Sequence, residues 1–235
     1  MAVEVDVLLE GLMNFQKSIS SKMSEVEGPH DWTHPSRMLK IGEKLKHFIL
    51  FDNREFKAAV TLHNVDRIKS YRERIFNEGF GTVCRNLLFG IGFSEEAENR
   101  IIDAVEKHSK LDKPDDSSLL IALRSADRLD WLGPIGVVGA AYMWTINGMY
   151  GDPDPFTLTE RGNPRNFYQD AIRQTEWYRM LPSDEVRSIV DPHMPGRLCF
   201  LRSFAAEISD RHGIENMVER DLKRALGLHY LRWSA

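Results

Sequence analysis

The sequence predicts an all-α fold, and three observations lead to that prediction. Apolar residues recur three and four positions apart along most of the 235 residues, which is the spacing of an amphipathic helix. No useful stretch alternates apolar and polar residues as a strand would. The hydrophobic fraction of 42% and the charged fraction of 28% are ordinary for a globular chain. We therefore expect an all-α helical bundle.

The periodic stretches also predict the order of the elements. Helices are expected near residues 5–19, 38–49, 56–60, 97–105, 120–131, 167–181, 198–208 and 215–232. Ser94 and either Asp116 or Ser117 are expected to cap helices, Gly133-Pro134 to end one, and Gly213 to end another. Glycine and proline gather at 147–164, which predicts a long loop. We expect one domain over 1–235, with a core at about 25–146 and C-terminal helices at 165–235.

Composition excludes several classes of protein. The net charge of −4 gives no general attraction to nucleic acid or to anionic membranes. Two cysteines, Cys84 and Cys199, argue against a disulfide framework or a cysteine-rich zinc site. The first apolar stretch contains acidic residues that a signal peptide excludes, and Ile135–Thr145 is too short to span a bilayer. We expect a soluble cytoplasmic protein with no membrane or nucleic-acid partner.

Four polar residues lie on the inward side of the predicted helices. His34, His63, His108 and Asp127 each stand four or seven positions from apolar residues of the same stripe. Separate core histidines would explain the imidazoles one by one. A buried ionised carboxylate, however, needs a partner, a cation or a shifted pKa. A divalent metal bound by imidazoles and Asp127 would account for all four residues together.

The motifs around these residues resemble the HD-domain metal-dependent phosphohydrolases, and most of all the small bacterial type. The opening His30-Asp31-Trp32-Thr33-His34, the doublet His63-Asn64, His108, and the late Ala126-Asp127-Arg128-Leu129-Asp130 follow in the same order. The resemblance covers Pro29–Gly136 and continues more weakly through 167–177 and 197–207. It implies a bundle of the HD type and a metal held by His34, His63, Asn64 and Asp127. The ion would be Mn, Mg, Ni, Fe or Co.

The doublet departs from the family pattern, because Asn64 stands where the family has aspartate. An amide oxygen coordinates a cation only as a neutral dipole, so the ligands carry one formal negative charge instead of two. Three accounts are open: a naturally degenerate site, replacement of the missing carboxylate by Asp66, or a substitution that inactivates an enzyme.

Other residues receive roles from their position beside these motifs. His108 is a candidate phosphate contact or general acid, or else a core histidine, and Asp66 is a candidate proton acceptor or a solvent-facing carboxylate. Asp31 would orient a ligand from behind or cap a helix. Arg67 and Lys69 are candidate phosphate-binding cations, and otherwise belong to a solvated helix face. Arg37, three residues after His34, could also reach a phosphate. Arg128 is the last candidate, and its alternative is an ion pair with Asp130.

Two functions compete at this point. The first is hydrolysis of a nucleotide or related phosphate ester by a metal-activated water, weakened or abolished by Asn64. The second is a catalytically degenerate HD domain that binds a nucleotide or a partner. A purely structural helical protein is the third class. The sequence leaves open whether the chain self-associates.

Overall fold

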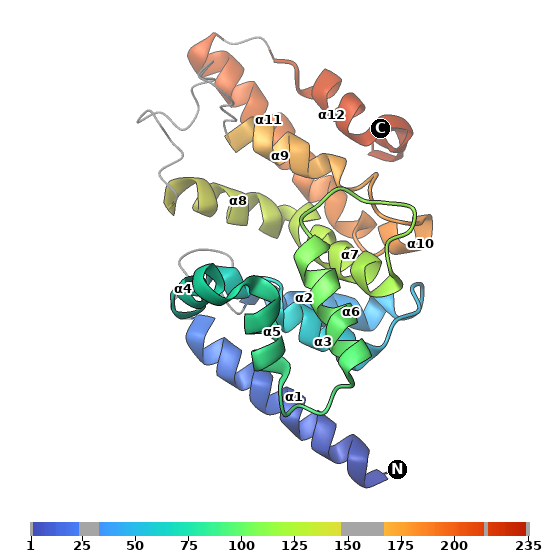
Figure 1. Ribbon diagram of the computed structural model, residues 1–235. Helices are drawn as coiled ribbons and strands as arrows, with labels where there is room; N and C mark the ends of the chain where they lie inside the picture. The colour runs from blue at the N-terminus through green and yellow to red at the C-terminus, as the bar shows by residue number, and fades with distance from the viewer. Residues whose placement is uncertain (1, 24–32, 147–166, 214–215, 234–235) are drawn as a thin grey trace. The chain divides into compact units, whose positions relative to one another are not determined.

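The computed structural model describes residues 2–23, 33–146, 167–213 and 216–233, and these residues contain helices and no strand (Figure 1). The all-α prediction is confirmed. The chain divides into two compact units, Met1–Asp127 and Arg128–Ala235. The expected single domain over 1–235 stays a prediction. The loop expected at 147–164 and the candidate residue Asp31 lie outside the described residues.

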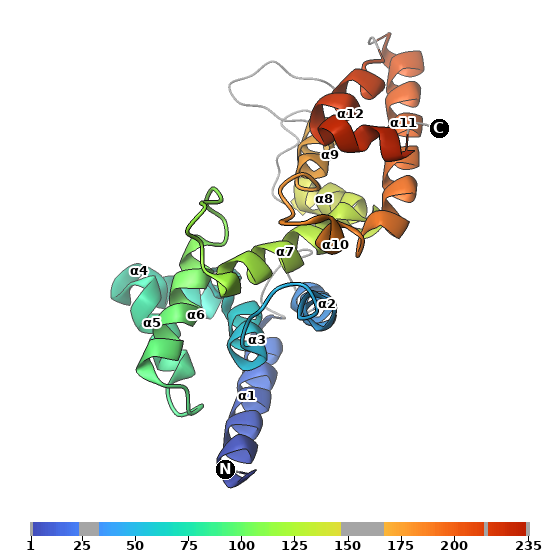
Figure 2. The same cartoon turned by 90° about the vertical axis from the view of Figure 1, so that its right-hand side faces the viewer.

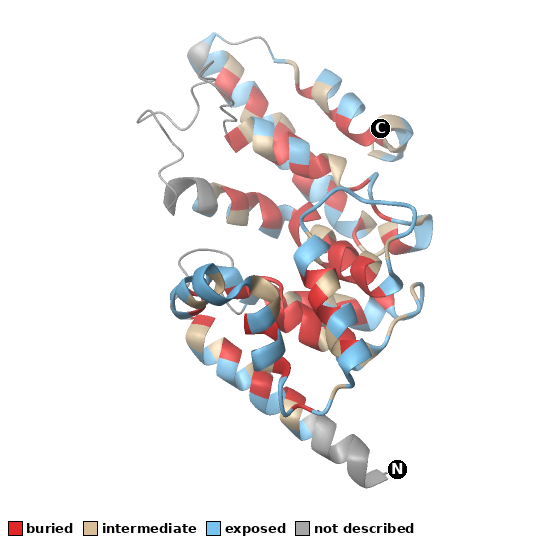
Figure 3. Cartoon of the chain, viewed as in Figure 1, coloured by how far each residue is buried: buried red, intermediate tan, exposed pale blue. Residues whose placement is uncertain are grey.

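The first unit is built around α3. Its helices are, in order, α1 (Ala2–Lys22), α2 (Thr33–Leu45), α3 (Asn53–Leu62), the short 3₁₀ helix η2 (Val65–Arg67), α4 (Lys69–Glu78), α5 (Phe80–Leu88), α6 (Glu95–Lys107) and most of α7 (Ser118–Leu132). Helix α3 packs against α1, α2 and α6 (Figure 2). Four residues in the second half of α3, Ala58, Ala59, Val60 and Leu62, have no exposed surface (Figure 3). The first unit therefore has a single central helix, and that helix carries His63 at its end.

The contact between α2 and α3 requires a glycine. A Cβ atom added at Gly42 would lie 2.2 Å from Cε1 of Phe56, which is too close for any side chain to occupy that position. The absence of a side chain lets the two helices approach closely. This approach brings the start of α2, where His34 lies, near the end of α3.

Side chains cap the helices that the sequence predicted would be capped. The hydroxyl of Ser94 accepts a hydrogen bond from the backbone N–H of Ala97 at 3.3 Å and starts α6. The hydroxyl of Ser117 accepts from Leu120 N–H at 3.3 Å, so of the two candidates it is Ser117 that caps α7. Asp116 instead accepts from the backbone N–H of Lys113 at 2.7 Å.

The second unit places α9 among its other long helices. After the end of α7 it contains α8 (Pro134–Ile146), α9 (Phe167–Glu176), α10 (Asp184–Arg187), η3 (Asp191–His193), α11 (Met194–His212), α12 (Val218–Leu226) and η4 (Gly227–Trp233). Helix α9 contacts α8, α11 and α12. Gly213 follows α11 with φ of +64°, the left-handed conformation that ends a helix, as predicted.

Several boundaries differ from the prediction for physical reasons. Helix α4 was not predicted because only Tyr71 among its residues is buried, which leaves almost no apolar stripe to detect. Helix α8 begins at Pro134, with only Gly133 between it and the end of α7, because proline is accepted in the first turn of a helix. Helix α5 was also missed, α2 and α9 end earlier than expected, and the last predicted helix splits into α12 and η4. No helix in the described ranges is long and apolar enough to cross a membrane.

The two cysteines are expected to react at very different rates with a thiol reagent. Burial, together with the carboxylates of Glu106 and Asp66, raises the pKa of the Cys84 thiol to about 12, whereas Cys199 is exposed. At about pH 8 only roughly one Cys84 in ten thousand is a thiolate, and the thiolate is the reactive form. Iodoacetamide should therefore label one thiol quickly, and Cys199→Ser should remove this fast phase. Cys84→Ser, the matched control, should leave it unchanged.

Candidate metal centre

His34 enters the centre from the first turn of α2. The helix begins at Thr33, so His34 precedes the apolar residues Met38 and Leu45 on the buried side of the helix. The His34 side chain has no exposed surface. Pro35 beside it is tolerated because the first-turn N–H groups of a helix have no intrahelical partner. The apolar packing of α2 therefore fixes His34 in the interior, as the sequence predicted.

His63 enters from the end of α3, where it is the C-terminal capping residue and is 2% exposed. Its Nδ1 lies 2.6 Å from the carbonyl oxygen of Val60, one turn earlier. Because a carbonyl only accepts, Nδ1 carries the proton and donates. The lone pair of the ring is then on Nε2. A backbone bond of this kind fixes the tautomer of metal-binding histidines.

Asp127 completes the group from α7, the helix that follows the α6–α7 connection. Its Oδ1 lies 3.2 Å from Nε2 of His34, and its side chain is 28% exposed. One ligand atom from each of His34, His63 and Asp127 lies within 4.8 Å of the others. Two atoms on opposite sides of a divalent ion at ordinary bond lengths are separated by roughly 4.2 Å. The three side chains therefore need only a small inward movement to hold one cation.

The electrostatics of the group suit metal binding. Burial, and then the neighbouring His34, lower the pKa of His63 well below its usual value, so at neutral pH its imidazole is neutral. Burial acts to raise the pKa of Asp127, but the hydrogen bond from His34 and the charges of the surrounding imidazoles outweigh it and lower this pKa. A neutral imidazole and an ionised carboxylate are the forms that bind metals.

His108 stands beside this group without belonging to it. It is the C-terminal capping residue of α6, it is partly exposed, and its ring lies 5.7 Å from that of His63, edge to face. The ring centroid of His34 lies 5.1 Å from that of His63. The Nδ1 of His108 donates to the carbonyl of Val105 at 2.6 Å, so its Nε2 is the atom available to a ligand.

Asn64 occupies the position that most affects the chemistry. The residue is 6% exposed, and its Nδ2 lies 2.7 Å from Nε2 of His63. Because His63 donates through Nδ1, its Nε2 accepts, and the Asn64 amide is the donor. The amide therefore occupies the same lone pair that a metal ion would take. A cation has to displace this hydrogen bond, whereas an aspartate here would have no proton to donate.

The predicted phosphate contacts are on exposed or partly exposed segments. Nη1 of Arg37 donates to the Thr33 hydroxyl at 3.2 Å. Arg67 ends η2 and Lys69 begins α4, and within the described part of the chain neither side chain forms an ion pair. Arg128 belongs to the second unit, where it donates to the carbonyl of Met180 at 3.1 Å. Asp66 is exposed beside Arg67.

Among the described residues of the first unit, sequence reasoning missed two buried charged residues, Glu55 and Arg124. Arg124 is 4% exposed and lies three residues before Asp127 on α7. Its guanidinium donates to the carbonyl groups at the end of α6, where His108 lies. The available signal was its position four residues after Leu120, on the apolar stripe of the predicted helix.

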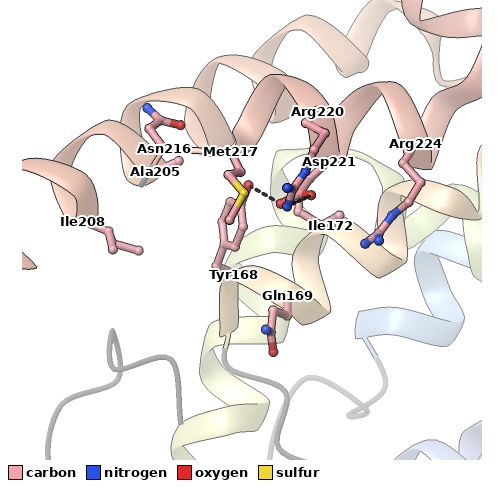
Figure 4. A pocket seen from close by; sticks show the side chains of 10 residues that line it. All are labelled: Tyr168, Gln169, Ile172, Ala205, Ile208, Asn216, Met217, Arg220, Asp221 and Arg224. Atoms are coloured by element: carbon pink, nitrogen blue, oxygen red, sulfur yellow. Dashed lines mark hydrogen bonds and ion pairs between the residues drawn. The ribbon is translucent and has the colours of Figure 1, made fainter. Parts of the chain in front are cut away.

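The second unit contains a separate cavity of about 230 Å³ between α9, α11 and α12 (Figure 4). Its apolar lining includes Ile172, Ile208 and Met217. Its polar rim includes Arg220 and Arg224. Figure 4 shows the Tyr168 hydroxyl beside Asp221, to which it donates at 3.4 Å. None of the residues proposed from the sequence as site residues lines this cavity.

Comparison with known proteins finds similar structures and no similar sequence family. No protein-family model matches the chain, and no curated protein matches it. A structural-genomics structure from Lactobacillus plantarum shares 17% identity and a TM-score of 0.70 over 86% of this chain and 98% of that chain. YpgQ of Bacillus subtilis, solved in complex with ADP, shares 19% identity and a TM-score of 0.60 over 84% and 97%.

A third match is the Lin1889 protein of Listeria innocua, with 16% identity and a TM-score of 0.61 over 88% of this chain and 97% of that chain. Each match spans nearly the whole of the other protein and both units of this one. The chain therefore has the helical fold of these bacterial proteins.

Proposed function

We propose that this chain is an HD-type phosphohydrolase that uses a divalent cation and acts on a nucleotide or a related phosphate ester. The observation that carries the proposal is the convergence of His34, His63 and Asp127 within 4.8 Å of one another. These residues come from three different helices, and their protonation states suit a cation. The fold shared with YpgQ, which is known in complex with ADP, supports a nucleotide as the ligand.

The roles of the residues follow from the atoms they present. When bound, a divalent cation supplies Lewis acidity toward a phosphate oxygen and lowers the pKa of water. His34, His63 and Asp127 would hold it. Nε2 of His108 would face the phosphate as a hydrogen-bonding group or general acid, because Nδ1 is occupied by Val105. Asp66 is the proposed proton acceptor.

Basic side chains would bind the phosphate oxygens. Arg67 and Lys69 are exposed and form no ion pair in the described segments, so binding an anion breaks no existing pair. Arg37 lies one turn after His34 on α2 and is the third candidate. Arg128 is the fourth candidate. Asp31 would orient a metal-binding imidazole without contacting the ion itself.

Asn64 is expected to weaken the centre considerably. At about 4 Å and an effective dielectric constant near 20, a unit charge pair contributes roughly 4 kcal/mol before desolvation is subtracted. The ligand set lacks this contribution because the amide is neutral. The hydrogen bond from Asn64 to His63 also has to break before a cation can bind.

That hydrogen bond favours a second candidate function. An amide that satisfies Nε2 of His63 at 2.7 Å stabilises the centre without any cation. A domain with this arrangement would bind a nucleotide through its basic side chains and leave it intact. The two functions share the nucleotide and differ in turnover.

Replacing Asn64 by aspartate is the experiment that tests the proposal. The variant should bind Mn²⁺ at least about tenfold more tightly, because it adds a carboxylate and removes a competing donor. Phosphate or pyrophosphate release from a nucleotide panel should rise with it. Metal content by mass spectrometry, calorimetry with Mn²⁺, and product analysis are the measurements.

Asn77→Asp is the matched control, since it adds the same charge at an exposed position on α4. It should change neither metal affinity nor turnover. If neither the unmodified protein nor the Asn64→Asp variant binds metal or releases product, the hydrolase proposal is wrong. Nucleotide binding without turnover in both forms would establish the binding function instead.

A further inference from the structure

Arg124 links α7 to the end of α6. Its Nη2 donates to the carbonyl of Lys107 at 2.7 Å and to that of Leu111 at 3.3 Å, and its Nε donates to the carbonyl of His108 at 3.1 Å. The last carbonyl groups of a helix have no partner within the helix. One side chain from α7 therefore satisfies the backbone around His108.

The charge of Arg124 is compensated inside the same connection. The carboxylates of Asp116 and Asp112 pair with its Nη1, the latter at 3.1 Å. Asp116 also accepts from the backbone N–H of Lys113 at 2.7 Å, which fixes the path of the chain between α6 and α7. A buried arginine with its donors and its charge satisfied is a rigid element, because moving it would leave several buried groups unpaired.

The group that this network holds in place is His108. The His108 ring is bound to the last turn of α6 through Nδ1 and the carbonyl of Val105, so ring and backbone move together. Its centroid lies 5.7 Å from that of His63. Arg124 precedes Asp127 by three residues, about one helical turn. Helix α7 thus carries both a member of the metal-binding group and the side chain that holds His108.

We infer that Arg124 is a positioning residue that sets the place of His108 relative to the group formed by His34, His63 and Asp127. The catalytic role of His108 rests on the proposed function. The claim that Arg124 holds the end of α6 in place rests on the hydrogen bonds between them. Lysine cannot replace arginine fully, because one ammonium group cannot reach three carbonyls and two carboxylates with the geometry of a planar guanidinium.

The test compares Arg124→Gln, His108→Gln, the double variant and Arg124→Lys, all in the Asn64→Asp background. Arg100→Gln is the matched control, because Arg100 also bridges two helices of this unit through Glu55 and lies in the middle of α6, about two turns before its end. The measurements are hydrogen exchange over 105–111 and 56–62, Mn²⁺ affinity, and kcat and KM on the nucleotide that the Asn64→Asp protein hydrolyses.

Arg124→Gln should speed exchange over 105–111 by at least about tenfold while exchange over 56–62 and Mn²⁺ affinity change little. It should lower kcat by roughly 10- to 100-fold and leave KM within a few-fold, as expected of a change in general acid–base geometry. In the His108→Gln background the same substitution should lower kcat no more than about threefold, because the imidazole that Arg124 positions is already absent. The exchange rate over 105–111 and the kcat of Arg124→Lys should lie between those of the Asn64→Asp parent and those of Arg124→Gln.

Unchanged exchange over 105–111 in Arg124→Gln overturns the inference, and so do losses of kcat that add in the double variant. If no protein turns over any nucleotide, the proposed function fails, while the exchange measurements still decide whether Arg124 holds this turn. If Arg124→Gln does not fold, as judged by circular dichroism, Arg124→Lys carries the same comparisons.

Discussion

Replacing Asp127 by asparagine should lower the affinity of the Asn64→Asp protein for Mn²⁺ by at least about 100-fold. Of the four proposed ligands, His34, His63, Asn64 and Asp127, Asp127 is the one whose side chain is an acid in the printed sequence. Its carboxylate is already ionised, because the hydrogen bond from His34 and the nearby imidazoles lower its pKa. Asparagine preserves the shape and removes the charge, so the loss reports electrostatics and not packing.

Calorimetry with Mn²⁺ measures this loss, and circular dichroism verifies that the variant remains folded. Asp103→Asn is the matched control, because Asp103 lies on α6 and forms an exposed ion pair with Lys107 outside the group of His34, His63 and Asp127. It removes one carboxylate from the same unit and should leave the Mn²⁺ affinity within about twofold, since exposed ion pairs contribute little. Equal losses in the two variants would show that the ion binds by net charge and that Asp127 is not a ligand.

Replacing Arg197 by methionine should lower the free energy of unfolding of the second unit by about 3–5 kcal/mol. Arg197 lies on α11 and has no exposed surface. Its guanidinium donates to the carbonyl groups of Ala171 at 2.6 Å and Trp131 at 2.9 Å, and its Nε donates to the Thr175 hydroxyl at 2.9 Å. Methionine would fill much of the space and leave these buried acceptors without a donor.

Burial lowers the pKa of Arg197 to about 9, which is still above neutral pH, so the buried group remains charged there. Urea unfolding followed by tryptophan fluorescence measures the effect, because residues 131, 144, 177 and 233 place four of the five tryptophans in the second unit. Arg211→Met is the control, since Arg211 is 70% exposed and pairs with Glu207 one turn away. It should change stability by less than about 0.5 kcal/mol. A similar small change in Arg197→Met would contradict the structural role given to this arginine.

The prediction from sequence succeeded best where helices have one apolar face. Helices α1, α3, α6 and α11 bury one side, so their stripes were visible in the sequence. Helix α4 buries only Tyr71, and α8 is apolar on almost every side, so neither shows a stripe. Capping was predictable for the same local reason, because a hydroxyl at Ser94 or Ser117 bonds within its own turn.

The candidate site also has features that the sequence predicted and features that only the structure revealed. The sequence showed that His34, His63, His108 and Asp127 point inward, and the motif order suggested that they meet. It gave no means to see that the Asn64 amide donates to Nε2 of His63, or that Arg124 holds the end of α6, because these bonds depend on side-chain torsions and on helices brought together by packing.

The sequence by itself determined the helical class, the main helices and the four inward polar residues, because periodicity and capping are properties of neighbours along the chain. Only the tertiary structure decided that His34, His63 and Asp127 lie within 4.8 Å of one another, and that Arg124 and Arg197 are buried. Those distances are set by the packing of helices distant in sequence, such as the close contact at Gly42 and Phe56, and no local pattern encodes them.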